Sequence, residues 1–522
     1  MLNMKLKYQI CFRLTLFVIV CTSKLLAQTP CKEIVGYYPN WQWYDRNKLV
    51  NPQSIDYSKY TILNYAFFKP EADGSISILD PWADKNILLG PINWAVAPAG
   101  YDSAYDFGNP AYHQPGQQFS QICHQHNVKL LPSIGGWTLS ENLPGIAADP
   151  AKRANFAQSC VELIQAFNFD GIDLDWEYPG YAEHGGTPQD ITNFTLLLQE
   201  IRTAIDNYGV SVNKSMLLTI AVGASQDRMD DVEWQEVSQT VDIINLMSYD
   251  FFGAWDANTN HNSPLYAPAA GDPTFNIDAA VDKLVNDYQV SPQKITVGVA
   301  FYGRTAKTTG PAGLHVPTTG AVDAITFATD EGSPLYYNVL LQQQLFTENW
   351  DALAKVPYLT GNNGLQTFVS YDNQHSVGLK AEYIVENQLR GAIIWEITGD
   401  YIETAPGSGI IASTPLVDTL NDVFCNYNPS DLGNPTIDGG MTDFISVYPN
   451  PVTDNLHIHL ANGSANQILL VDLTGKTVFS TIPYDLMDQI IDVHSLPNGT
   501  YVLKIVTDQQ TIHQSIIINH LV

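Results

Sequence analysis

The sequence has little positive charge. Its 522 residues include 25 Lys and Arg against 54 Asp and Glu, so the formal net charge is −29. A chain this negative repels DNA, RNA and anionic lipid surfaces. We therefore expect no nucleic-acid partner, whereas an uncharged polymer would meet no such repulsion.

Long apolar runs are also lacking. The apolar stretch Leu14–Cys21 falls short of the about 20 residues that cross a bilayer. It follows Lys5, Lys7 and Arg13, a pattern typical of a secretory signal peptide. We expect residues 1–27 to be removed on export and the mature chain to have no membrane span.

Cysteine is scarce. Beyond the signal peptide the chain has Cys31, Cys123, Cys160 and Cys425. An even number in an exported chain permits two disulfides in three pairings, and four buried thiols are the alternative. Cys31 and Cys425 bracket the large domain, so we favour that pair. The spacing fits no zinc site, and we predict neither a metal nor a cofactor.

Eight short β-branched and aromatic runs are present, each followed by a helix-like stretch. They begin at Ile34, Thr61, Lys129, Asp170, Leu217, Val241, Ile295 and Gly391. Nearly continuous apolar runs are typical of buried parallel strands. Eight such units predict an α/β fold, a (β/α)8 TIM barrel over residues 28–425, with its active site at the carboxyl ends of the strands.

Two further regions interrupt or follow this pattern. Residues 305–371, between strands seven and eight, predict an inserted α+β subdomain. Prolines, glycines and asparagines mark residues 426–440 as a linker. Residues 441–522 alternate apolar and polar side chains between turn signals, which predicts a small all-β sandwich.

The strongest chemical signal is the run from Phe169 to Tyr178. Side chains alternate along a strand, so Asp173, Asp175 and Glu177 share one face and the apolar residues between them share the other. Acids buried together cannot all ionise at neutral pH, so at least one pKa should be raised. A protonated carboxyl is what a general acid needs. An exposed acidic strand or a calcium-binding loop is the alternative. This run, however, lacks the glycine spacing of the helix-loop-helix calcium motif.

The run DGIDLDWE, from Asp170 to Glu177, resembles the DxxDxDxE motif of glycoside hydrolase family 18, the retaining chitinases. Three more of the family's motifs have matches, in the family's order along the chain. They are Ser133 to Gly136 (SxGG), Met247 to Asp250 (MxYD), and Gly298 to Arg304 together with Ile394 to Glu396. The resemblance spans about residues 31–425.

This resemblance implies substrate-assisted hydrolysis, in which no protein nucleophile attacks the sugar. Glu177 would protonate the glycosidic oxygen while the substrate's own acetamido oxygen attacks C1. Asp175 would stabilise the resulting oxazolinium ion, and Asp173 would share a proton with Asp175. Tyr249 would hold the acetamido oxygen in place.

Seven more residues are expected to bind the sugar: Trp395, Trp137, Asp250, Tyr178, Met247, Tyr302 and Arg304. Either tryptophan could instead be a core residue. Arg304 could instead form an ion pair with a barrel acid without contacting the sugar. We expect His184 and His261, in loops, to be merely solvated.

The tail resembles the C-terminal sorting domain of the type IX secretion system. The matching residues are Val447 to Pro451, Asp472 to Lys476 and Leu496 to Tyr501. A carbohydrate-binding sandwich is the competing interpretation. The sorting domain implies the type IX machinery as a partner and a protein that is secreted or attached to the cell surface. We expect the protein to be a monomer.

The resemblance therefore implies an endo-acting chitinase that binds chitin or N-acetylglucosamine oligosaccharides. A chitin-binding lectin of the same fold is one alternative, although such lectins typically lose the acid that Glu177 retains. An endo-β-N-acetylglucosaminidase or a peptidoglycan hydrolase is the other.

Overall fold

The computed structural model describes residues 32–426 and, further on, residues 445–448, 452–453, 455–460, 467–472, 476–481, 488–506 and 511–520. The chain divides into two compact units, residues 1–427 and 428–522. The predicted signal peptide, Cys31 and nearly all of the predicted linker lie outside the described residues.

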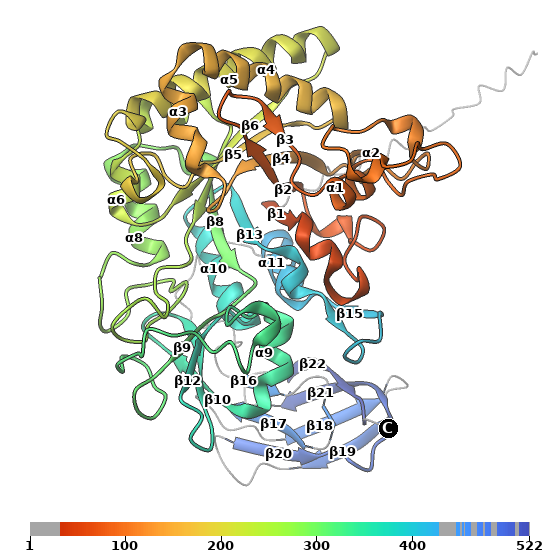
Figure 1. The fold of residues 1–522 in the computed structure, drawn as a ribbon. Coiled ribbons are helices and arrows are strands. Elements are labelled where there is room, and N and C mark those ends of the chain that lie inside the picture. Colours follow the sequence, from red (N-terminus) through yellow and green to blue (C-terminus); the bar gives the residue numbers. More distant parts are fainter. Residues whose placement is uncertain are drawn as a thin grey trace, which may run out of the picture. The chain divides into compact units, whose positions relative to one another are not determined.

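The first unit is built on a closed barrel of eight parallel strands (Figure 1). In spatial order they are β1 (Glu33–Pro39), β13 (Gly391–Trp395), β8 (Ile295–Ala300), β7 (Ile243–Met247), β6 (Leu217–Gly223), β5 (Gly171–Asp175), β4 (Lys129–Gly135) and β2 (Ile62–Pro70). The barrel closes because β1 pairs with both β13 and β2. The TIM barrel predicted from the sequence is confirmed.

Helices surround this barrel (Figure 1). They are α1 (Pro81–Leu88), α2 (Phe119–Gln125), α3 (Leu143–Ala148), α4 (Pro150–Phe167), α5 (Asp190–Val212), α6 (Gln226–Asp230), α7 (Trp234–Thr240), α8 (Ile277–Asp282), α10 (Gln374–Glu386) and α11 (Pro415–Asn426). The start of α4 is set by its sequence: the Asp149 carboxylate accepts from two backbone N–H groups, and Pro150 occupies the first helical position.

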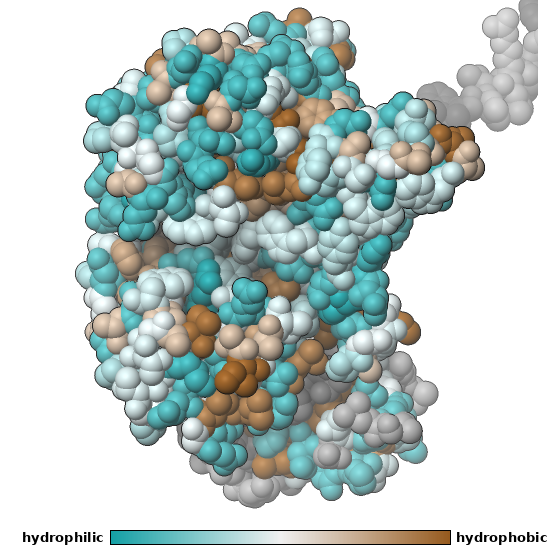
Figure 2. All heavy atoms as spheres, viewed as in Figure 1, coloured by the Kyte–Doolittle hydropathy of each residue, from teal (hydrophilic) through white to brown (hydrophobic). Residues whose placement is uncertain are grey.

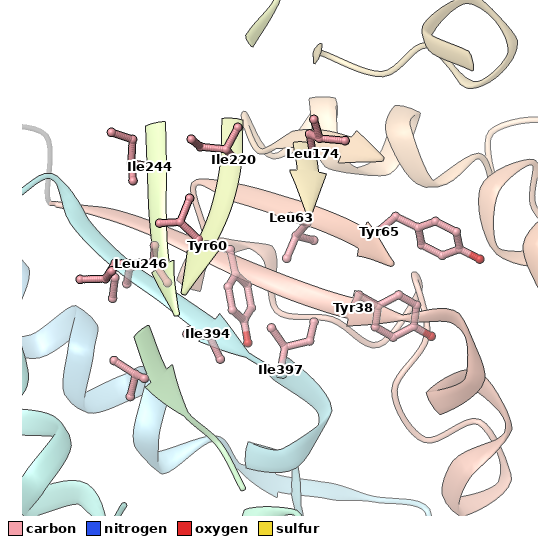
Figure 3. Close-up of a cluster of buried hydrophobic side chains, with 14 of the residues drawn as sticks. Tyr38, Tyr60, Leu63, Tyr65, Leu174, Ile220, Ile244, Leu246, Ile394 and Ile397 are labelled. Atoms are coloured by element: carbon pink, nitrogen blue, oxygen red, sulfur yellow. The ribbon is translucent and has the colours of Figure 1, made fainter. Parts of the chain in front are cut away.

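The two faces of the barrel strands have different roles. Leu174, Ile220, Ile244 and Ile394, from β5, β6, β7 and β13, lie in the buried cluster between strands and helices (Figure 3). Because side chains alternate along a strand, the neighbours of Leu174 on β5 point into the barrel instead. This alternation places acids at the centre of the barrel.

The predicted α+β insertion follows β8. A four-stranded antiparallel sheet has the order β10 (Phe346–Asp351), β11 (Val356–Gly361), β12 (Thr367–Ser370) and β9 (Arg304–Lys307). Helix α9 (Tyr336–Gln342) lies between β9 and β10 in the chain. Short hairpins are formed by β3 (Ile76–Ser77) with β2, and by β14 (Ile402–Glu403) with β15 (Ile411–Ser413).

The cysteines resolve part of the disulfide question. Cys123 and Cys160 are free, buried thiols, so they do not form the second disulfide that the cysteine count permits. Cys425 is disulfide-bonded. The favoured partner, Cys31, lies outside the described residues.

The second unit consists of two antiparallel sheets. One has the order β16 (Ile445–Tyr448), β17 (Asn455–Leu460), β20 (Asp488–Asp492), and the other β19 (Thr477–Thr481), β18 (Gln467–Asp472), β21 (Gly499–Val506), β22 (Thr511–Ile518). Residues of both sheets, among them Leu456 and Leu503, share one buried core. The predicted small all-β fold is confirmed.

The coloured surface in Figure 2 is mostly hydrophilic or intermediate, and its hydrophobic patches are separate. Within the described ranges, no helix is long and apolar enough to cross a membrane.

Candidate active site

Asp173, on β5, is fixed by side chains from four other strands of the barrel. The hydroxyls of Tyr37 and Ser133 donate to its Oδ2 at 2.6 and 2.8 Å. Thr219 Oγ1 and Asn245 Nδ2 donate to its Oδ1, the latter at 3.2 Å. Burial raises the pKa of Asp173 even though these four donors oppose the shift. The carboxyl is therefore both immobile and easily protonated.

Asp175 is the next acid on the same face of β5. It is 3% exposed, and its buried Oδ1 has no hydrogen-bond partner among the described residues. Burial, and then the charges of Glu177 and Asp173, raise its pKa well above the ordinary value. The fold thus leaves open an acceptor whose desolvation costs about 1–3 kcal/mol.

Glu177 lies two residues beyond the end of β5, whereas the sequence pattern placed it on the strand. Its N–H donates to Ser140 Oγ at 2.9 Å, and its carbonyl accepts from His184 Nδ1 at 2.7 Å. Burial and the charge of Asp250 raise the pKa of Glu177 to about 7, against hydrogen bonds from Tyr178 and the Trp137 backbone. The side chain can therefore hold a proton near neutral pH.

Tyr249 and Asp250 follow the end of β7, where Met247 is buried. Burial raises the pKa of Tyr249 well above its usual value, with contributions from Tyr302 and Asp175. Its hydroxyl therefore stays protonated. The Tyr302 hydroxyl donates to Asp250 Oδ1 at 2.6 Å.

Arg304 makes a bidentate ion pair with Asp250. Its Nε and Nη2 each lie 2.6 Å from a carboxylate oxygen, and its Nη1 donates to Ser333 Oγ at 2.9 Å. Burial disfavours the guanidinium charge, but Asp250 outweighs burial and raises the pKa of Arg304. Its guanidinium also lies 5.3 Å from the ring centroid of Trp255, which is 59% exposed. This pairing was the alternative role that the sequence left open for Arg304.

Aromatic rings gather around Trp395, at the end of β13. Its ring stacks on Phe67 with centroids 5.6 Å apart, and lies 5.5 Å from Tyr37 and 6.3 Å from Trp41. Trp41 is 45% exposed. Since Tyr37 also binds Asp173, this aromatic group lies directly beside the acids.

A second aromatic group includes Trp137, which is 51% exposed. Its ring centroid lies 4.4 Å from His184, 6.0 Å from Tyr181 and 6.4 Å from Tyr178. Tyr178 is also the hydrogen-bond partner of the Glu177 side chain. This group therefore borders the terminal acid.

Two histidines differ from the sequence-based expectation. His184 is not merely solvated, because it binds the Glu177 carbonyl and packs on Trp137. His261 is fully buried, with its Nε2 2.9 Å from Asp351. Periodicity along the chain carried no signal for these contacts: Glu177 precedes His184 by seven residues in an irregular loop, and Asp351 lies 90 residues from His261.

The residues that hold Asp173 were not predicted from the sequence. Tyr37, Thr219 and Asn245 come from three different strands and contact it only once the barrel closes. Their positions at the inward face of predicted strands were the available signal. Within the part of the chain that the structure describes, no group of three or more His, Cys, Asp or Glu side chains could hold a metal ion.

Comparison with known proteins identifies the barrel. Residues 33–400 match the family described as glycosyl hydrolases family 18. The chain belongs to this family. Its tail, residues 446–519, matches the secretion system C-terminal sorting domain, so family 18 chemistry is joined here to a signal for export to the cell surface or beyond. This match favours sorting over the carbohydrate-binding interpretation of the tail.

Relatives of the family are similar over much of this length. Chitinase A1 of Niallia circulans is 35% identical over 480 residues, which cover 85% of this chain and 67% of that protein. A group IV chitinase of Ostrinia furnacalis has a TM-score of 0.63 at 32% identity, covering 75% of this chain and 99% of that one. A family 18 N-acetylglucosaminidase of Paenibacillus barengoltzii has a TM-score of 0.58 at 27% identity, with the same coverage of both chains.

Proposed function

We propose that this protein is an endo-acting chitinase, which hydrolyses β-1,4 bonds between N-acetylglucosamine units with retention at C1. One observation carries the proposal. Asp173 and Asp175 are buried and Glu177 is half-buried, and the contributions that shift their pKa values come from burial, from neighbouring acids and from polar neighbours rather than from a cation among the described residues. Such a group stores protons near neutral pH.

Glu177 is the general acid. A carboxyl with a pKa of about 7 is protonated in a large fraction of molecules at neutral pH, and it can donate that proton to the glycosidic oxygen. After the sugar leaves, the carboxylate accepts a proton from the incoming water. The same group thus serves both half-reactions.

Asp175 is the partner of the substrate's own nucleophile. Its unpaired Oδ1 needs a donor, and the N–H of the 2-acetamido group supplies one. As the acetamido oxygen attacks C1, positive charge spreads over the oxazolinium ring, and the carboxylate stabilises it. Two displacements at C1, first by the acetamido oxygen and then by water, give retention.

Asp173 and Tyr249 support this step. Asp173 carries a raised pKa and can take up the proton that Asp175 gives up, while its four donors keep it still. The Tyr249 hydroxyl remains protonated and can donate to the acetamido oxygen, which keeps that oxygen beneath C1.

The remaining residues bind the sugar chain. Trp395 offers a flat apolar face beside the acids, and pyranose rings stack on such faces. Trp137 offers an exposed ring next to Tyr178. The proposed contacts of the sugar hydroxyl and acetamido groups are Asp250, Tyr302, Arg304 and, at the buried end of β7, Met247.

The decisive experiment is a product time-course on N-acetylglucosamine oligosaccharides of known length. We expect internal cleavage with dimers as the main small product, and retained configuration at C1. Glu177→Gln should lower kcat by about 10²–10⁴ while binding the oligosaccharide normally.

Each rival function gives a different result. Binding without hydrolysis by the wild type indicates a lectin, and release of monomers alone indicates an exo-acting N-acetylglucosaminidase. Cleavage of N-glycans or peptidoglycan in place of chitin oligosaccharides identifies the two other hydrolases. Near-normal turnover by Glu177→Gln would remove Glu177 from its role.

A further inference from the structure

The turn that carries Tyr249 and Asp250 is held in an uncommon backbone conformation. Asp250 has a φ of 59°, a left-handed value that costs a residue with a Cβ about 1–2 kcal/mol. Its N–H donates to Asn262 Oδ1 at 2.9 Å, and the N–H of Phe251 donates to the Asn262 carbonyl at 3.1 Å. The conformation of the turn therefore depends on a second segment, around Asn262.

That second segment is itself tied to the start of the turn. Ser263 Oγ donates to the carbonyl of Ser248, the residue before Tyr249, at 2.7 Å. The same hydroxyl accepts from Lys380 Nζ at 2.8 Å. All three residues are buried, with 3%, 0% and 0% of their surfaces exposed for Ser263, Ser248 and Lys380.

Lys380 comes from α10, and its ammonium is paired with Asp372 at 2.6 Å. Ser376 Oγ donates to the other oxygen of Asp372 at 2.7 Å. A fully buried ion pair is a poor source of stability, since apolar residues of the same volume often serve as well or better. The fixed geometry of this pair is the more informative property.

The ammonium decides which way the Ser263 hydroxyl points. A hydroxyl has one proton and can donate in only one direction. Because Lys380 has only donors, Ser263 must accept from it, and its single proton is then directed to the Ser248 carbonyl. The charge on Lys380 thus fixes a hydrogen bond to the backbone of the turn.

We propose that Ser263 and Lys380 are positioning residues that hold the Tyr249–Asp250 turn in the conformation that binds the N-acetyl group of the substrate. The proposal rests on the function assigned above to Tyr249 and Asp250. Neither Ser263 nor Lys380 touches substrate in this arrangement. Ser263 acts on the backbone of the turn, and Lys380 acts through Ser263.

The test compares Ser263→Ala with Ser376→Ala. Both remove one buried hydroxyl from the same chain of hydrogen bonds, but only Ser263 contacts the turn. For Ser263→Ala we expect kcat on the N-acetylglucosamine pentamer to fall about tenfold, with KM changed less than threefold. Ser376→Ala, which also removes a capping hydroxyl of α10, should lower the melting temperature and leave kcat unchanged.

Two further measurements separate positioning from general loosening. In the Glu177→Gln background, Ser263→Ala should weaken binding of the acetylated pentamer by less than threefold, in line with the small change in KM, and leave binding of the fully deacetylated pentamer unchanged. The alkaline limb of kcat/KM should also move to lower pH, because the charge of Asp250 contributes to the raised pKa of Glu177. The other groups that act on Glu177, namely Asp175, Tyr178, Tyr249 and the Trp137 backbone, are present in both variants.

A double variant, Lys380→Met with Asp372→Leu, removes the ion pair without leaving a buried charge unpaired. If it folds with the kcat, binding and pH profile of the wild type, the proposal is overturned. Equal kcat for Ser263→Ala and Ser376→Ala overturns it as well. A wild type that fails to cleave the acetylated pentamer instead refutes the proposed function, so the two failures are distinguishable.

Discussion

The interior acids and the rim carboxylate of this barrel are stabilised in opposite ways. Asp173 and Asp175 are buried without a cation beside them among the described residues, and burial raises the pKa of both. Asp250, at the rim, is held by the two guanidinium nitrogens of Arg304. A buried carboxyl without a cation tends to take up a proton, whereas arginine, which binds both oxygens of a carboxylate, fixes the position of the group. The interior is therefore suited to proton transfer and the rim to fixed binding.

The largest expected effect concerns the interior. Asp175→Asn keeps the shape of the side chain but removes the negative charge that would stabilise the oxazolinium ion. We expect kcat on chitin oligosaccharides to fall by about 10²–10³. The matched variant is Asp173→Asn, whose contacts are all to protein donors, and its loss should be several-fold smaller. Equal losses in steady-state kinetics would erase the distinction between the two acids.

Stability should respond in the opposite direction to activity at the terminal acid. The pKa of Glu177 is about 7 in the folded protein and about 4.3 when unfolded, so the folded state binds more protons in between and the free energy of unfolding falls as pH rises through this window. Glu177→Gln lacks this fall. We expect it to gain about 3 kcal/mol over the wild type between pH 4 and pH 8 in urea unfolding.

The control for this prediction is Glu236→Gln, at an exposed position on α7. It should show no gain that depends on pH. If the Glu177 variant behaves like the Glu236 variant at both pH values, the pKa of Glu177 is not raised by burial.

At the rim, Arg304→Lys tests whether geometry matters as well as charge. A lysine keeps one positive charge but cannot span both oxygens of Asp250 and reach Ser333 at once. We expect kcat/KM to fall about tenfold. The reference is Lys307→Arg, on the same strand but paired with Asp323, which should leave kcat/KM unaltered. Full activity of Arg304→Lys would show that the positive charge at this position is sufficient and that the bidentate geometry is not needed.

The smallest effect links the two regions through the pH profile. Glu177 must be protonated to donate, so kcat/KM should fall as pH rises through about 7. Asp250→Asn removes a charge that helps to raise that pKa, and the alkaline limb should move to lower pH by a few tenths of a unit. The control is Asp272→Asn, at an exposed position in the loop between β7 and α8, which should leave the alkaline limb in place. An unmoved limb in Asp250→Asn would mean that the rim does not influence the acid.

Much of the fold could be predicted because the signals were local. The eight barrel strands were expected from runs of apolar residues, and their starts lie within two residues of the structure. That the side chains of Asp173 and Leu174 point to opposite faces of the strand follows from strand geometry alone. Glu177 was different, since the strand ends at Asp175 and the acid is placed by contacts from Ser140, 37 residues away, and from His184 in the loop that follows.

The candidate site was predictable as a set of residues but not as a set of contacts. The spacing of acids along one strand, and the motifs at the carboxyl ends of β4 and β7, identified Asp173, Asp175, Glu177 and Tyr249 as candidates. Their partners come from distant segments: Tyr37 lies 136 residues from Asp173, and Arg304 lies 54 residues from Asp250. No periodicity in a sequence reports such pairings.

Alternation of side chains, charge composition and turn residues are properties of the chain itself, and they determined the barrel, the inserted subdomain and the inward direction of the acids. Which acid keeps an unpaired oxygen, which takes a proton near pH 7 and which is bound by arginine depended on burial and on neighbours that only the closed barrel provides. The physical reason is that a pKa reflects the surroundings of a group in three dimensions, whereas the sequence records only its order along the chain.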